Sequence, residues 1–198
     1  MPPATRAILI TNISVFLLQP AGGEGFAERF ALWPPGSSDP GFGLWHLVTY
    51  SFLHGGLAHI IFNMYALYMF GGDIERLFGS LFFLAYYFVC VICAGLFRLM
   101  VSSLVGGPGY PVIGASGAVY GVLLAFGISF PRRIVILIIP PIPMQARTFV
   151  VVVGLMELVF GVTGTEAGIA HFAHLGGMFG GWLMLKYHSG RFPFSGPD

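Results

Sequence analysis

The sequence contains very little charge. Only 9% of its 198 residues are Asp, Glu, Lys or Arg, whereas roughly 25% of a soluble globular protein is charged. Hydrophobic residues make up 56% of the chain, and its mean hydropathy is +0.84. Such a chain lacks the polar surface to cover itself in water, which favours a membrane as its solvent. The net charge of +1 also argues against a nucleic-acid partner.

Cysteine is equally scarce. The two cysteines, Cys90 and Cys93, lie inside an apolar run, and no soluble redox fold is evident around them. We interpret them as packing residues, because buried free cysteines behave as small hydrophobes. The first apolar stretch lacks a clear small-residue cleavage site, so it is expected to be a retained helix rather than a signal peptide.

Long apolar runs dominate the rest of the sequence. A membrane-spanning helix needs about 20 mainly apolar residues. Six segments come close to this requirement: about 5–20, 57–73, 80–101, 115–130, 146–163 and 169–187. Segment 131–147 is apolar but broken by three prolines, so it is not counted as a span. We therefore expect an all-α membrane protein, with residues 1–198 forming one bundle of six transmembrane helices.

Lys and Arg predict the orientation of this bundle, because cytoplasmic loops carry an excess of both residues. With both termini in the cytoplasm, two of the nine basic residues, Arg29 and Arg98, lie outside. The other seven lie inside: Arg6, Arg76, Arg132, Arg133, Arg147, Lys186 and Arg191. We therefore expect both termini to be cytoplasmic. The compact chain without a transit peptide suggests a multi-pass protein of a bacterial inner (plasma) membrane.

Several polar residues interrupt the apolar spans, where they are costly and by default indicate function. His59 and Asn63 lie near the outer end of the second span, and Ser116 lies near the outer end of the fourth. His171 and His174 occupy the outer end of the sixth. Three polar clusters at one depth on three helices predict a single site.

Glycine spacing predicts which helices meet. Gly117 and Gly121 are four residues apart on the fourth helix, and the sixth helix repeats this spacing twice within 176–181. Small residues at such positions let helix backbones approach closely in lipid. The fourth and sixth helices are therefore expected to pack together, which would place Ser116 beside His174.

A serine beside a histidine can act as a nucleophile with the imidazole as general base. A third group usually orients the base, but no acid is expected at this depth, because Glu157 is placed deep in the fifth span and Glu166 in a loop. Tyr120 lies one turn below Ser116 and could stack on His174 instead. These positions predict a dyad rather than a triad.

A tetrahedral intermediate also needs hydrogen-bond donors for its oxyanion. His59 and Asn63 are four residues apart, hence on one face of the second helix, and both can donate. The backbone N–H of Ser116 is a third candidate, because the first N–H groups of a helix have no intrahelical partner.

These residues resemble the motifs of the rhomboid family of intramembrane serine proteases. Segment 114-GASG-117 is similar to the family's GxSG motif, 59-HIIFN-63 to its HxxxN motif and 173-AHLGG-177 to its AHxGG motif, all in the family's order. The chain departs from the family at Trp45-His46, where many members have Trp-Arg. This departure concerns the first outer loop rather than the chemistry.

The resemblance implies a serine endopeptidase without cofactor or metal. Ser116 would be the nucleophile and His174 the base, His59 and Asn63 would help form the oxyanion hole, and Tyr120 would pack on the imidazole. The substrate would be a transmembrane helix of another protein, cut near the outer face of the membrane. His171 is then expected to face the outer water.

Three other functions stay in competition. A non-catalytic rhomboid-like protein that binds transmembrane helices would share the fold, although it would be expected to lose the serine or the histidine. A metal-dependent hydrolase could use four histidines as zinc ligands, His54, His59, His171 and His174, but the sequence lacks HExxH. A transporter would need polar groups through the whole bilayer. The sequence indicates neither the substrate protein nor the oligomeric state.

Overall fold

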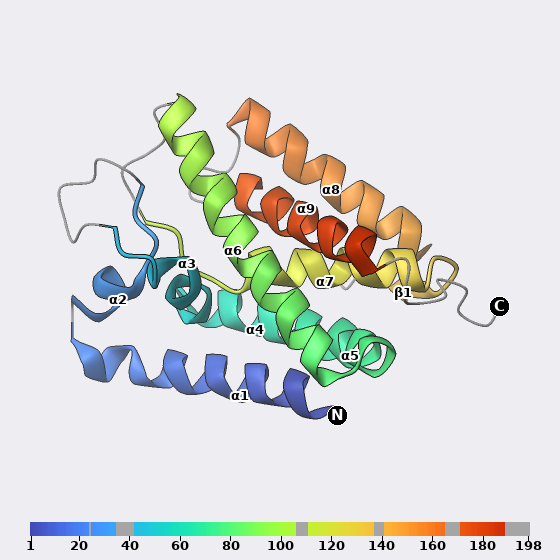
Figure 1. Cartoon of the computed structure of the whole chain (residues 1–198), viewed down its shortest axis with the longest axis horizontal. Helices are drawn as coiled ribbons and strands as arrows, with labels where there is room; N and C mark the ends of the chain where they lie inside the picture. The colour runs from blue at the N-terminus through green and yellow to red at the C-terminus, as the bar shows by residue number, and fades with distance from the viewer. Residues whose placement is uncertain (24, 35–41, 106–110, 137–140, 165–170, 189–198) are drawn as a thin grey trace.

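Six long helical segments make up most of the chain (Figure 1). The structure is a computed structural model that describes residues 1–23, 25–34, 42–105, 111–136, 141–164 and 171–188. The long segments are α1 (Pro3–Leu18), α4 with η3 and α5 (Leu57–Ala66, Leu67–Gly71, Gly72–Phe78), α6 (Ser80–Val105), α7 (Ser116–Ser129), α8 (Ala146–Thr163) and α9 (His171–His188). They coincide with the six predicted helices to within a few residues, apart from 169–170, which lie outside the described residues.

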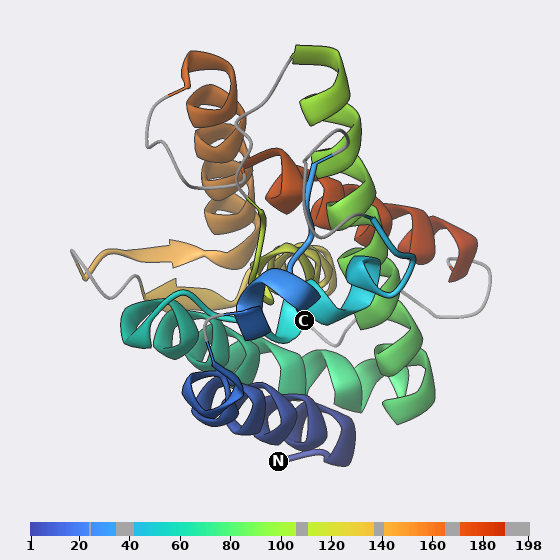
Figure 2. The ribbon, with the colours of Figure 1, turned by 90° about the vertical axis from the view of Figure 1, so that its left-hand side faces the viewer.

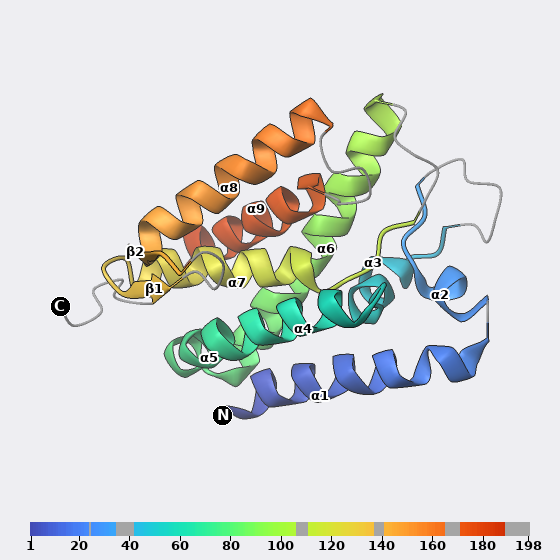
Figure 3. The ribbon, with the colours of Figure 1, turned by 180° about the vertical axis from the view of Figure 1, so that it is seen from behind.

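The helices are stacked in the order α1, α4–α5, α7, α9 and α8, and α6 crosses one side of this stack (Figures 1 and 3). Seen from the side, α1 and α8 remain at opposite edges (Figure 2). The central helix α7 is the most enclosed, with ten buried residues among its 14. Helices α4, α7 and α9 all begin at the same end of the bundle.

Among the described residues, two helices are long and apolar enough to cross a membrane. They are Ser80–Leu104 of α6 and the whole of α8, judged by length and hydropathy alone. Helices α1 and α7 are apolar but shorter. Helix α9 has 18 residues, but four glycines, three histidines and a lysine dilute its hydropathy.

Helices α7 and α9 touch through their backbones. A Cβ placed on Gly177 would lie 1.9 Å from the carbonyl oxygen of Gly117, and one on Gly121 would lie 3.0 Å from that of Gly177. No side chain larger than hydrogen fits at Gly177, so this contact holds the two helices at their closest approach. The predicted packing of the fourth helix on the sixth is confirmed.

The far end of the bundle is tied together by Glu75 of α5, which is 2% exposed. Its carboxylate accepts hydrogen bonds from the backbone N–H groups of Ala4 and Thr5 at 2.8 and 2.6 Å. It also accepts from the hydroxyls of Thr5 and Ser80 at 2.7 Å each. The start of α1 is therefore capped by an acid from another helix, because the first N–H groups of a helix need acceptors from elsewhere.

The described residues of the proline-rich segment 131–147 form no span, as predicted. Its described part pairs two short antiparallel strands, β1 (Ile134–Ile136) and β2 (Pro143–Gln145). This hairpin lies between the end of α7 and the start of α8.

The connection from α1 to α4 contains short helical pieces. These are η1 (Pro20–Gly22), α2 (Gly25–Phe30), α3 (His46–Thr49) and η2 (Tyr50–Phe52). His46 is buried, accepts a hydrogen bond from the Gly43 N–H at its Nδ1, and lies 2.8 Å from the Arg29 carbonyl oxygen at its Nε2. His46 thus tethers this loop to the end of α2.

Candidate active site

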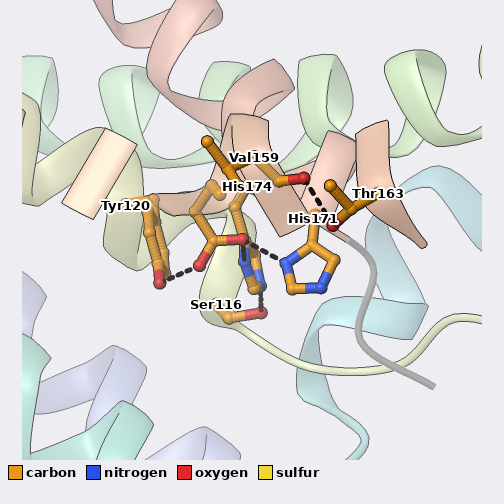
Figure 4. Close-up of polar contacts among 7 residues, drawn as sticks. Ser116, Tyr120, Val159, Thr163, His171 and His174 are labelled. Carbon is orange, nitrogen blue, oxygen red and sulfur yellow. Dashed lines mark hydrogen bonds and ion pairs between the residues drawn. The ribbon is translucent and has the colours of Figure 1, made fainter. Parts of the chain in front are cut away.

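Ser116 and His174 come from two helices that begin at the same end of the bundle. Ser116 is the first residue of α7, and His174 lies in the first turn of α9. The close contact between Gly117 and Gly177 sets the spacing of these helices. The Oγ atom of Ser116 lies 2.8 Å from Nε2 of His174 (Figure 4). This distance allows the hydroxyl to donate its proton to the imidazole.

Tyr120 packs flat against His174. The two rings are nearly parallel, with an interplanar angle of 5° and centroids 4.3 Å apart. Tyr120 lies one turn after Ser116 on α7, so a single helix face carries both the hydroxyl and the ring that supports the imidazole. The stacking predicted from the sequence is present.

The structure corrects the prediction that no acid reaches this depth. Glu157 of α8 is buried, and its Oε2 lies 2.9 Å from Nδ1 of His174, on the side of the ring opposite Ser116. The two atoms are close, but the angle at Nδ1 of His174 toward this oxygen is not that of a well-aligned hydrogen bond. Glu157 lies only six residues before the end of α8 at Thr163. The sequence-based expectation was wrong because this part of α8 lies beside the first turn of α9, a tertiary contact that spacing along the chain does not reveal.

His171 was expected to face outer water, and this expectation is also wrong. Its side chain is 6% exposed, and its Nδ1 lies 2.7 Å from Oε2 of Glu157. The hydroxyl of Tyr120 donates a short hydrogen bond to the other carboxylate oxygen. Figure 4 shows the rings of Tyr120, His171 and His174 converging on this point.

Three of these side chains could also hold a metal ion. Ligand atoms of Glu157, His171 and His174 all lie within 4.8 Å of one another. The direct contacts of both histidines with the Glu157 carboxylate are enough to explain why the three groups lie so close together. The grouping does, however, place an acid beside two of the histidines considered as zinc ligands.

A cavity of about 470 Å³ opens beside Ser116 and His174. Its wall includes His59 at the start of α4 and Gly114 just before α7. Gly114 has φ of +121°, and a Cβ there would lie 2.6 Å from Nε2 of His59. Glycine at 114 is therefore required both by the backbone conformation and by the close approach of the imidazole. Ser116, the first residue of α7, lines the same cavity.

Asn63 lies one turn beyond His59 on α4. It is buried, and its amide donates a hydrogen bond of 2.9 Å to the His59 carbonyl oxygen. It is not among the described residues that line the cavity. The structure thus places His59 at the cavity wall and Asn63 behind it, so an oxyanion role for Asn63 stays a prediction.

His54 lies in the loop before α4 but is only 1% exposed. Its ring meets that of His59 edge-on, with centroids 5.0 Å apart. Gln19 at the end of α1 exchanges two hydrogen bonds with the His54 backbone, of 3.1 and 2.9 Å. Burial, and to a lesser degree the neighbouring His59, lowers the pKa of His54 from 6.5 to about 4.

This lowered pKa predicts acid sensitivity of the fold. Between pH 6.5 and 4 the unfolded chain takes up a proton at His54 that the folded chain does not, so stability falls as the pH falls through this window. From pH 7.5 to pH 5 we expect a loss of about 2 kcal/mol from this residue. Unfolding of the wild type and of His54→Gln in detergent, compared at both pH values, measures it. An equal loss in both proteins would contradict the assignment.

Comparison with known proteins gives a consistent picture. A family described as the Rhomboid domain matches residues 41–191. The chain is 34% identical over 140 residues to the rhomboid protease GluP of Bacillus subtilis and 32% identical over 188 residues to the rhomboid protease GlpG of Photorhabdus laumondii. It is 29% identical over 185 residues to GlpG of Yersinia enterocolitica. These matches cover 70%, 93% and 92% of this chain, but 25%, 61% and 61% of the relatives' own lengths.

Proposed function

Because this chain belongs to the rhomboid family, we propose that it is an intramembrane serine endopeptidase that cleaves transmembrane helices of other proteins. The observation that carries the proposal is the 2.8 Å contact between Ser116 Oγ and His174 Nε2 at the wall of a cavity. A nucleophile within hydrogen-bond reach of its base is the geometry that acyl transfer requires.

In the first half of the reaction, Ser116 Oγ attacks the carbonyl carbon of the scissile peptide and passes its proton to His174 Nε2. The carbonyl oxygen gains a negative charge. The tetrahedral intermediate then breaks its C–N bond, and His174 returns the proton to the departing amine. An acyl group remains bonded to Ser116.

In the second half, a water molecule gives a proton to His174 and attacks the acyl carbon. The C–O bond to Ser116 breaks, the proton returns to Oγ, and the carboxylic acid product leaves. Both steps form an oxyanion, which the N–H of Ser116 and the imidazole of His59 would stabilise by hydrogen bonding. The position of His59 in the cavity wall supports this role, and Asn63 would act by holding the start of α4.

We further propose that residues 1–198 form one six-span domain with both termini cytoplasmic, in a bacterial inner (plasma) membrane. Ser116, His59 and His174 would then lie near the outer face, and the cavity would supply water to them. The bacterial sources of the similar proteases support the choice of membrane.

The test uses purified protein in detergent with a model transmembrane substrate that carries a small residue at the cut. We expect cleavage that survives a metal chelator, together with a fluorophosphonate adduct on Ser116. Cleavage that stops with the chelator would favour a metal-dependent hydrolase at Glu157, His171 and His174. No cleavage and no adduct would favour a protein that binds helices without cutting them.

A further inference from the structure

We propose that Glu157 is a positioning residue that extends the Ser116–His174 pair to a Ser–His–Glu triad, and that helix α8 carries this third member. The inference rests on the proposed protease function. It starts from three contacts of one buried carboxylate: to Nδ1 of His174 at 2.9 Å, to Nδ1 of His171 at 2.7 Å, and to the hydroxyl of Tyr120.

The carboxylate sets the tautomer of the base. Ser116 can donate its proton to His174 Nε2 only when Nε2 carries no hydrogen, so the imidazole hydrogen must then be on Nδ1. Nδ1 of His174 is buried, and Oε2 of Glu157 is the acceptor next to it. A buried N–H without an acceptor is unfavourable. Glu157 therefore favours the one tautomer that can take the serine proton.

The carboxylate also opposes the charge that develops during the reaction. When His174 accepts the proton it becomes an imidazolium, and a carboxylate at 2.9 Å stabilises that cation. Catalytic hydrogen bonds are often poorly aligned without substrate and tighten when it binds. The imperfect angle at Nδ1 is therefore compatible with this role.

Two further residues hold the carboxylate in place. Oε1 accepts the hydrogen bond of Tyr120, and Oε2 accepts that of His171. Tyr120 also stacks on His174, so one side chain fixes both the base and the acid that orients it. These contacts explain why His171 is buried although it takes no direct part in the proposed chemistry.

Most of the surface of helix α8 is otherwise not covered by protein. Among its 18 residues only Ala146, Val150 and Glu157 are buried, and the first two lie in its opening turns. Glu157 is therefore the one buried residue in the outer half of α8. Docking of this helix against α7 and α9 brings the acid to the base.

The experiment compares Glu157→Gln with Glu75→Gln. Both residues are buried glutamates that accept several hydrogen bonds, but Glu75 lies at the opposite end of the bundle from Ser116. For each variant, kcat, KM and the labelling rate of Ser116 by a fluorophosphonate are measured on the folded fraction. We expect E157Q to lower kcat and labelling about 100-fold with KM unchanged, whereas E75Q lowers the unfolding temperature and leaves kcat unchanged.

Glu157→Asp tests the charge separately. It keeps the carboxylate but shortens the side chain by one methylene, so we expect kcat about tenfold above that of E157Q and still below that of wild type. A kcat for E157Q within threefold of wild type would overturn the proposal, as would equal kcat losses in E157Q and E75Q.

If E157Q yields no folded protein, E157D decides. A reduced kcat at unchanged KM supports the proposal, and a wild-type kcat overturns it. A wild type that neither cleaves nor reacts with the probe would instead count against the protease function itself, so the two failures are distinguishable.

Discussion

Replacing Ser116 by alanine is expected to lower the turnover of a transmembrane substrate at least about 10,000-fold. The substitution removes the atom that forms the acyl bond, which is the hydroxyl that contacts His174 Nε2 among the described residues. His174→Ala should cause a loss of similar size, because without the base the serine keeps its proton. The double variant should be no worse than either single one, since the two groups act as a unit.

Ser129→Ala provides the matched control. Ser129 is the last residue of the same helix, is buried, and lies at the end of α7 far from the cavity. Its variant should cleave at the wild-type rate. Substrate turnover that persists in S116A would move the chemistry away from the α7–α9 contact.

Replacing Gly177 by alanine should have the largest effect on stability. The added methyl group would lie 1.9 Å from the Gly117 carbonyl oxygen, so α7 and α9 must separate. Overpacking of this kind costs roughly 3 kcal/mol. Because the same contact spaces Ser116 from His174, cleavage should fall together with the unfolding temperature measured in detergent.

Gly154→Ala is the control for this prediction. Gly154 of α8 also faces α9, but its added methyl would meet only the end of Met178, at 3.4 Å from Cε. This is ordinary van der Waals contact with a flexible side chain, so stability and cleavage should stay near wild type. If G154A and G177A behave alike, the backbone contact between α7 and α9 does not set the site.

The sequence predicted the meeting of Ser116 and His174 because Ser116 adjoins Gly117 and His174 lies one turn before Gly177. Gly117 and Gly177 define where two helices can touch, and residues within a turn of them are carried into the contact. Tyr120 followed from helical spacing alone. Both predictions use spacing within a single helix. Such spacing is reliable because it determines toward which side of the helix each side chain points.

Glu157 was missed because its position depends on where a helix ends, not on local spacing. Counted back from the end of α8 at Thr163, Glu157 lies in the outer half, level with the first turns of the antiparallel α9. An acid in an apolar span indicates function by default, and this signal was available. His171 was expected in water for a related reason: a single polar residue near a helix end looks exposed until its tertiary partners are known.

The sparse burial of the second half of α8 has a consequence for how the lipid bilayer would act on the proposed site. An 18-residue helix is about 27 Å long, slightly shorter than a typical hydrocarbon core of about 30 Å. Helices adjust to thicker or thinner bilayers by changing tilt, and in α8 a change of tilt displaces the Glu157 carboxylate relative to the His174 ring. Membrane thickness, and with it acyl-chain length, is therefore expected to set the strength of the base without any ligand binding to the protein.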